Sequence, residues 1–434
     1  MTSFETEARL AIHGGEPLRK RPFAPNCFIG GRERELLLEA FEGSSWSGFR
    51  AGIQRHDPRT LCEIPSADAL AFGDGEALFL GGRWVRRLEA MYAARAGVRY
   101  AVACNSATSG LVMAAGALDL GPGDEVLVPC MSFHATATAL VPWGCVPVFV
   151  EVKSDTFCID AADAALKITP RTRAIMVVHL GGSPANMDEI LSLARTHDLR
   201  VIEDCAQSLG ARFRGREVGA IGDVGVHSLT ETKSITCGEG GVLMTDDARI
   251  ARKARLIRNH GEGVADERWS DDDLVNVVGM NYRLTDLQAA LAIAQFEQID
   301  DRNRARHDNA SHLAARLARW PCFVRQAVEA EATPAWFLFK TRYVPGPGMP
   351  SRNELAAMLA AEGIPTVAGY VRLLYENPLF TRRGARYGKG TCPRSEAING
   401  EFLWFPFINP PNDRADMDDA ADAIEKILSS AGQV

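Results

Sequence analysis

The chain has 434 residues, of which 46% are hydrophobic and 24% charged, a composition that excludes a disordered, fibrous or collagen-like protein. At about 150 residues per domain, this length predicts two or three domains. The formal net charge is −7 and no long run of one sign occurs, which argues against a nucleic acid as the main partner.

One stretch, residues 126–150, carries no charged side chain and is nominally long enough to cross a bilayer. It contains Pro129, Pro142 and Pro147, each of which removes a backbone donor that lipid cannot replace. We therefore interpret it as buried protein core and expect no membrane partner. The N-terminus has no basic segment followed by a continuous apolar run, so we expect no signal peptide and a cytoplasmic location.

The ten cysteines form no CxxC pair and no zinc-type spacing with histidine, so we expect reduced, packed thiols and no metal. Along the chain, residues 1–75 contain Gly and Pro clusters around one helical pattern at 32–41, which predicts an N-terminal arm. A helix is then predicted at 83–96, where Val85, Leu88 and Tyr92 share one face.

From residue 100 onward, predicted strands and helices alternate. Strands are predicted at 100–103, 125–129, 146–150, 174–180, 200–204, 224–229 and 242–245, and helices between them at 106–118, 134–140 and 188–197. Helices of this length between strands imply crossover connections, a mostly parallel sheet and helices on both of its faces. The predicted fold class is therefore α/β.

A smaller α/β unit is predicted after this sheet. The charged segment 300–308 suggests a boundary, followed by a strand at 337–344 and helices at 351–362 and about 417–428. Ser351 and Glu354 have capping-box spacing, and Gly363 stands just past the end of its helix. The predicted division is an arm at 1–75, a large domain at 76–310 and a small C-terminal domain at 311–434.

Three strand ends could carry chemistry, because open parallel sheets bind ligands there. After the first strand, residues 105–110 (NSATSG) open a helix whose free N–H groups suit a phosphate, although Ser and Thr are also ordinary caps. Asp204 ends another strand and is either a salt-bridge partner, a helix cap or a carboxylate that keeps a heteroaromatic nitrogen protonated.

Lys233 lies between two core strands, among small residues and glycines. It is either a solvated loop lysine or a desolvated amine held against a cofactor. An anion cradle, a strand-end Asp and a loop Lys together are what pyridoxal 5'-phosphate requires. Other cofactor motifs are missing from the sequence, since no GxGxxG follows the first strand and no GxxxxGK[ST], HExxH or GxSxG occurs.

Four segments resemble, in order and spacing, the DegT/DnrJ/EryC1/StrS family of fold-type I pyridoxal-phosphate aminotransferases, which act on sugars and aminocyclitols. They are GPGDEVLVPCMSFHATA, VIEDCAQSLGARFRGREVGAIGD, HSLTETKSITCGEGGVLMTDD and GMNYRLTDLQAALA. The resemblance covers about residues 81–300 and extends more loosely through the C-terminal unit. It implies a seven-stranded-type sheet in the large domain.

The resemblance implies a role for each matching residue. Lys233 would be the Schiff-base lysine and general base, Asp204 the partner of the pyridine nitrogen, and Gln207 a neighbour of the ring's phenolic oxygen. The remaining matches are Phe133 stacked on the ring, Ala107, Thr108 and Ser228 around the phosphate, and Asn281 reaching the neighbouring subunit's cofactor in a homodimer. Gly is more frequent in the family where Ala107 stands, and Val where His134 stands; the latter difference suggests a role in specificity.

The implied reaction moves an amino group from glutamate or glutamine to a keto sugar or ketocyclitol, in amino-sugar or secondary-metabolite (including antibiotic) biosynthesis. Two alternatives remain at this stage. A related lyase would use the same cofactor for dehydration, although Lys233 argues against the relatives that carry His in its place. A non-enzymatic cofactor-binding regulator is disfavoured by the intact pair of Asp204 and Lys233. Arg258, His260 and Tyr370 are further candidates for substrate contacts.

Overall fold

The computed structural model describes residues 9–26, 29–43, 46, 81–261, 278–370, 372–382 and 387–431. Its main feature is a seven-stranded sheet in the order β1-β9-β8-β5-β4-β2-β3. Strands β8, β5, β4, β2 and β3 are parallel, whereas β9 is antiparallel to both β8 and β1. The strands are β1 (Tyr100–Cys104), β2 (Glu125–Pro129), β3 (Val146–Val150), β4 (Thr172–Val178), β5 (Arg200–Asp204), β8 (Val224–Ser228) and β9 (Gly241–Thr245). The predicted α/β class and mostly parallel sheet are confirmed.

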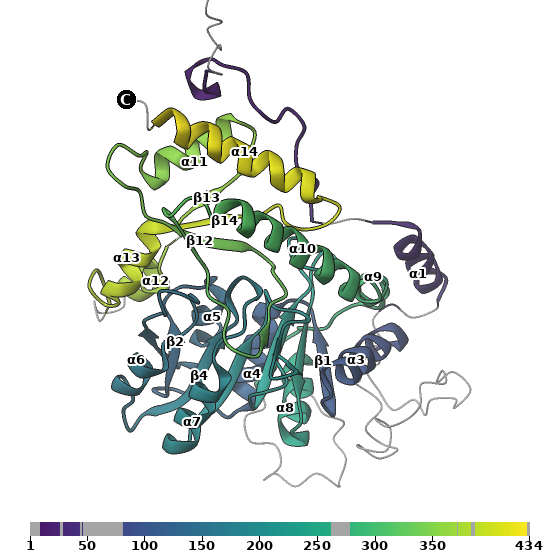
Figure 1. The fold of residues 1–434 in the computed structure, drawn as a ribbon. Helices are drawn as coiled ribbons and strands as arrows, with labels where there is room; N and C mark the ends of the chain where they lie inside the picture. The colour runs from purple at the N-terminus through teal and green to yellow at the C-terminus, as the bar shows by residue number, and fades with distance from the viewer. Residues whose placement is uncertain are drawn as a thin grey trace, which may run out of the picture.

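Helices cover both faces of this sheet (Figure 1). One face packs against α4 (Ala107–Ala117) and α8 (Ala248–Arg258). The other packs against α3 (Arg83–Ala96), α6 (Ala161–Leu166), α7 (Met187–His197) and α9 (Asp286–Phe296). Because side chains alternate along a strand, Val102 of β1 joins the first cluster while its neighbours Ala101 and Ala103 join the second.

The uncharged stretch 126–150 lies within this core. It comprises most of β2, then α5 (Ala135–Thr138), the 3-10 helix Val141–Trp143 and β3. Both strands are almost entirely buried, as expected for parallel strands covered on two faces. Across the described residues, the longest apolar helical segments fall short of what is needed to span a bilayer.

A second sheet, with the order β10-β12-β14-β13, lies in the C-terminal part of the chain. Its strands are β10 (Phe323–Arg325), β12 (Phe339–Tyr343), β13 (Val367–Ala368) and β14 (Phe402–Phe405), and its core is shared with α10 (Ile299–Leu317), α11 (Arg352–Ala361) and α14 (Arg414–Ala431). Ser351 and Glu354 form the predicted capping box of α11, and Gly363 follows that helix with φ +86°. Smaller elements are α12 (Pro378–Thr381), α13 (Pro393–Glu401) and the three-stranded sheet of β6 (Arg212–Phe213), β7 (Arg216–Glu217) and β11 (Ala332–Thr333).

The charged segment 300–308, where the sequence suggests a domain boundary, lies inside α10, and Arg302 and Arg306 are buried there. A charged run in sequence gives no information about which of its members face a core, and here the helical period turns these two arginines inward. The division of the chain near residue 310 stays a prediction, and that position falls within α10.

The N-terminal arm is fastened to the C-terminal unit (Figure 1). The Phe23 ring stacks on Phe407 with centroids 3.9 Å apart, and Arg19 pairs with Asp416 at 2.9 Å. The arm contains the 3-10 helix Ala11–His13 and α1 (Gly31–Glu42), and α1 packs against α9. The predicted end of the arm near residue 75 lies outside the described residues, as do most of residues 44–80.

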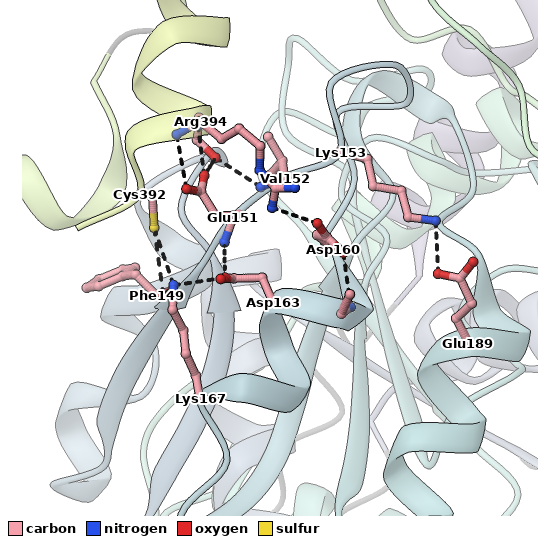
Figure 2. A network of polar contacts seen from close by, with 12 residues as sticks. Phe149, Glu151, Val152, Lys153, Asp160, Asp163, Lys167, Glu189, Cys392 and Arg394 are labelled. Carbon is pink, nitrogen blue, oxygen red and sulfur yellow. Dashed lines mark hydrogen bonds and ion pairs between the residues drawn. The ribbon is translucent and has the colours of Figure 1, made fainter. Parts of the chain in front are cut away.

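Helix α13 is joined to the large sheet by a polar junction, shown in Figure 2. Glu151, just after β3, accepts hydrogen bonds from the backbone N–H of Arg394 at 3.0 Å and of Ser395 at 2.7 Å. A carboxylate at the first turn of a helix satisfies N–H groups that have no partner within the helix. The Arg394 side chain pairs with Asp160 at 2.6 Å.

Candidate active site

The predicted site residues gather where the strands of the large sheet end. Gly241, the first residue of β9, is paired with Cys104 of β1 on one side and with Ser228 of β8 on the other. On the next strand of the sheet, β5, Asp204 is paired with Val226 of β8. The ends of β1, β8 and β5 therefore share one edge, as expected for a ligand site in an open sheet.

The start of α4 forms a cradle at this edge. Ser106 caps the helix by accepting a hydrogen bond from the Ser109 N–H at 3.1 Å, and Ala107 and Thr108 occupy the first turn, whose N–H groups have no partner within the helix. A Cβ atom on Gly241 would lie 2.6 Å from the Ala107 nitrogen. Only glycine therefore allows β9 to approach the helix start, and its partner Ser228 is buried beside it.

Asp204 is a buried carboxylate oriented by donors. Its Oδ2 accepts a hydrogen bond from the Thr136 hydroxyl at 2.7 Å, and its Oδ1 accepts one from the Ala206 N–H at 3.1 Å. Burial raises the pKa of Asp204 above its ordinary value, although these hydrogen bonds and the charge of Lys233 act in the opposite direction. A buried carboxylate in this state is stabilised by any cationic group that binds against it.

The residue before it, Glu203, is fully buried and accepts four hydrogen bonds. Its donors are the His179 ring at 3.0 Å and the backbone N–H groups of Gly219, Ile221 and Gly222 at 2.6–2.8 Å. Burial acts to raise the pKa of Glu203, but these donors outweigh it and hold the pKa below its ordinary value. Glu203 thus fixes the end of β5 and with it the position of Asp204.

Lys233 lies on the connection between β8 and β9 and is partly buried. Its Nζ atom lies 4.8 Å from the centroid of the Phe337 ring. Burial lowers the pKa of the Lys233 amine, and the charge of Asp204 partly opposes this shift. A larger fraction of this amine is therefore neutral, and so able to react as a nucleophile or accept a proton, than in a solvated lysine. The Lys233 amine lies close enough to Asp204 for each charge to affect the pKa of the other.

Phe133 and Gln207 lie beside this pair. Phe133 is 60% exposed, and its carbonyl accepts a hydrogen bond from the N–H of Thr136, the residue that also holds Asp204. Gln207 is buried in the loop after β5, where its Oε1 accepts from the Gly181 N–H at 2.7 Å and its Nε2 donates to the Tyr370 hydroxyl at 2.8 Å. The Gln207 amide is thereby fixed in one orientation.

Asn281 and His134 are placed differently. Asn281 has an exposed side chain, and its carbonyl accepts a hydrogen bond from Asn105 Nδ2 at 3.4 Å, near the start of α4. The ring of His134, just before α5, lies 3.3 Å from Asn377 Nδ2. The sequence reasoning missed Thr136, Phe337, Asn26 and Arg306, which contact Asp204, Lys233 or the Lys233 loop.

These residues fit pyridoxal phosphate. The fit rests on a helix start that only Gly241 leaves accessible, a buried carboxylate suited to a pyridinium nitrogen, and an amine with a lowered pKa. Such a donor set, on a seven-stranded sheet of this order, defines the class of fold-type I pyridoxal-phosphate enzymes.

Comparison with known proteins identifies the family within this class of enzymes. The model of the DegT/DnrJ/EryC1/StrS aminotransferase family matches residues 67–425. The chain belongs to this family and is a pyridoxal phosphate-dependent aminotransferase.

Among its relatives, the UDP-N-acetyl-3-dehydro-alpha-D-glucosamine 3-aminotransferase of Acidithiobacillus ferrooxidans is 42% identical over 79% of this chain and 90% of its own length. The GDP-perosamine synthase of Caulobacter vibrioides is also 42% identical, but the match covers 55% of this chain and 63% of that protein. The L-glutamine:2-deoxy-scyllo-inosose aminotransferase of Streptoalloteichus tenebrarius is 32% identical over 83% and 92% of the two chains.

Solved structures agree with the fold. An aminotransferase from Psychrobacter cryohalolentis superposes with a TM-score of 0.81 and 27% identity over 95% of this chain and 100% of its own. DesV from S. venezuelae, determined in complex with a ketimine intermediate, gives a TM-score of 0.72 and 32% identity over 81% and 90% of the two chains.

Proposed function

We propose that this aminotransferase converts a keto group on a sugar or cyclitol ring into an amine, with glutamate or glutamine as the amino donor. The observation that carries the proposal is the pair of Asp204 and Lys233 at one sheet edge beside the α4 cradle. The acceptor class is supported by the relatives, whose names include two nucleotide-sugar enzymes and an inosose aminotransferase. We place the reaction in amino-sugar or secondary-metabolite biosynthesis.

The geometry of the site supports the following residue roles. The backbone N–H groups of Ala107 and Thr108, with the Ser228 hydroxyl, would bind the phosphate. Asp204 would keep the ring nitrogen protonated, Phe133 would cover one face of the ring, and Gln207 would lie near its phenolic oxygen. Lys233 would bind the cofactor through Nζ and, once released by the donor, would take the proton from the donor's α-carbon.

When bound, pyridoxal phosphate supplies an electron sink for the bond broken at that α-carbon. Lys233 Nζ would hold that proton and release it again, and it would run the same transfer in reverse when the keto acceptor enters. The lowered pKa of Lys233 suits this task, because it increases the neutral fraction of the amine, which is the form that accepts a proton.

We further propose a homodimer in which Asn281 reaches the partner's cofactor phosphate. Its exposed side chain supports this role. A cytoplasmic location is supported by the eight described cysteines, all of them buried and free.

The deciding experiment starts from enzyme loaded with pyridoxamine phosphate and adds keto sugars and ketocyclitols one at a time. We expect the visible absorption band of lysine-bound pyridoxal phosphate to return with an acceptor, and Lys233→Ala to abolish that band. Lys20→Ala, which changes an exposed lysine paired with Glu16, is the matched control. Products of elimination without amination would refute the transferase reaction for that substrate, and an unchanged band in Lys233→Ala would refute the lysine's role.

A further inference from the structure

Three successive backbone carbonyls of the Lys233 loop accept hydrogen bonds from side chains that are distant in sequence. Asn26 Nδ2 donates to the carbonyl of Thr232 at 2.9 Å and to that of Lys233 itself at 2.6 Å. Arg306 Nη2 donates to the carbonyl of Ser234 at 3.1 Å. The loop is a series of turns, so these carbonyls lack the partners that a sheet or helix would provide.

Asn26 and Arg306 also bind each other. Asn26 Oδ1 accepts from Arg306 Nη2 at 3.0 Å, which leaves the Asn26 amide nitrogen facing the loop. Arg306 is fully buried in α10, and among the residues that the structure describes the neighbouring charge that acts on it is that of Arg302, not of a carboxylate. Burial lowers the pKa of its guanidinium to about 9. Burying this charge is costly, and the hydrogen bonds that Arg306 donates to Asn26, Asn303 and the Ser234 carbonyl offset part of that cost.

Helix α10 holds the Asp204 side of the site as well. Arg306 Nη1 donates to Asn303 Oδ1 at 3.1 Å, and Asn303 Nδ2 donates to the carbonyl of Leu209 at 2.9 Å. Leu209 belongs to the loop that follows Asp204. One turn of α10 therefore contacts both loops that carry the proposed cofactor residues.

The arm reaches the site as a fixed segment. Two residues before Asn26, Ala24 forms a reciprocal pair with the Asn412 side chain, donating its N–H at 2.8 Å and accepting at 3.1 Å. Phe23 is stacked on Phe407. Asn26 thus enters the site already positioned by the C-terminal unit.

From these contacts we propose that Asn26, held by Arg306, is a positioning residue for Lys233: it fixes the peptide groups on both sides of the lysine and so aims Nζ at the reacting carbon. The inference rests on the proposed role of Lys233. Small displacements of a reacting group are costly, and a shift of about 1 Å can slow a reaction about 100-fold.

The experiment compares Asn26→Asp and Asn26→Ala in the holoenzyme. Aspartate keeps the acceptor for Arg306 and adds a negative charge beside a buried guanidinium, but it places an oxygen against the carbonyls of Thr232 and Lys233. We expect Asn26→Asp to melt no lower than the wild type, and to carry out the single-turnover half-reaction with the amino donor about 10- to 100-fold more slowly. The KM for the donor should stay within about twofold. Asn26→Ala should be slowed less than Asn26→Asp.

Lys20→Ala is the matched control, because it changes an exposed residue of the same arm that is paired with Glu16. Its half-reaction should keep the wild-type rate. Asn412→Ala, which loosens the arm at Ala24, should slow the half-reaction less than Asn26→Asp does. A rate within about twofold of wild type for both Asn26 variants, or an equal loss in Lys20→Ala, would overturn the positioning role. Arg306→Lys is the second variant: it retains the charge but not both hydrogen bonds, and we expect a similar slowing. Lys233→Ala, measured alongside, tests the proposed function separately. An intact half-reaction in Lys233→Ala would refute the proposed role of Lys233 itself, whereas the Asn26 variants test only how that lysine is positioned.

Discussion

The hydroxyl of Thr136 donates a 2.7 Å hydrogen bond to Asp204, and Ser132 lies 2.7 Å from the same hydroxyl. This chain links the turn before α5 to the end of β5, so the segment that carries Phe133 and the proposed pyridinium partner are held as one unit.

Removing this donor with Thr136→Val should raise the pKa of Asp204 further, because a hydrogen bond to a charged group is worth about 1.5–3 kcal/mol. A higher pKa leaves less ionised Asp204 at acidic pH. We therefore expect the acidic limb of the profile of kcat/KM against pH to move upward by about one pH unit. Thr138→Val, on the same helix, removes a hydrogen bond to the His134 carbonyl and should leave the limb in place. Equal profiles for the two variants would contradict this relationship.

Gly241→Ala should weaken cofactor binding. The new Cβ would lie 2.6 Å from the Ala107 nitrogen, so the start of α4 must move away from the sheet edge. Overpacking of this kind costs about 1–3 kcal/mol, which corresponds to a Kd for pyridoxal phosphate about 5- to 150-fold higher. Titration of the apoenzyme with the cofactor measures it. Gly121→Ala, where a Cβ meets nothing within 4 Å, is the control, and equal affinities for both variants would refute the cradle.

Lys340→Met should stabilise the protein at neutral pH. Lys340 is buried, donates to the Leu180 carbonyl and lies 5.6 Å from the centroid of the Phe157 ring, and burial lowers its pKa to about 8. Below that pH the folded state carries the cost of a buried charge, about 3 kcal/mol at most. Subtracting about 1 kcal/mol for the lost hydrogen bond, we expect a gain of about 1–2 kcal/mol at pH 7.

This gain should disappear as the pH rises. Between the folded pKa of about 8 and the ordinary value of 10.5, the unfolded chain binds more protons than the folded one, so wild-type stability increases with pH while the variant lacks this increase. Unfolding by urea at pH 7 and pH 10, with excess pyridoxal phosphate, measures the difference. Parallel pH dependences for the two proteins would show that Lys340 is not the titrating group.

Glu203→Gln should destabilise the fold by about 3 kcal/mol or more, because an amide nitrogen would replace an oxygen that accepts hydrogen bonds from N–H groups in a buried site. The folded pKa of Glu203 is lowered, so its contribution is present above the ordinary pKa of 4.5 and is lost as the pH falls through the folded value. The difference between wild type and variant should therefore be largest near pH 7 and shrink below about pH 4.5. Glu16→Gln, at an exposed site, should leave the stability nearly unchanged.

The sequence predicted the parts of the site that are marked by local pattern. Asp204 follows an apolar strand and Lys233 lies between two, so their places at the sheet edge could be predicted from hydrophobic periodicity and motif. Asn26 carries no such signal, because it lies 207 residues from Lys233 and binds through a single side-chain amide. Thr136 lies within the uncharged stretch 126–150. In the sequence, a threonine whose hydroxyl donates to a carboxylate looks the same as a threonine that is only packed in the core.

Arg306 shows a different limit. In sequence it belongs to a charged segment that resembles a solvent-exposed boundary, whereas in the structure it is buried beneath the Lys233 loop. Its burial depends on the packing of α10 against the arm and the C-terminal unit, which involves segments hundreds of residues apart. Long-range packing of this kind is not encoded in any local spacing.

The antiparallel placement of β9 has a consequence for folding. Strands β8 and β9 form a hairpin that the Lys233 loop connects, and their register determines which residue lies opposite Ser228. A slip of one residue would bring Val242 to the place of Gly241. The valine side chain would then fill the space beside Ala107 that the proposed phosphate site needs. In that proposed site only the native register would bind the cofactor, so pyridoxal phosphate supplied during refolding should draw mispaired hairpins toward the correct one by mass action.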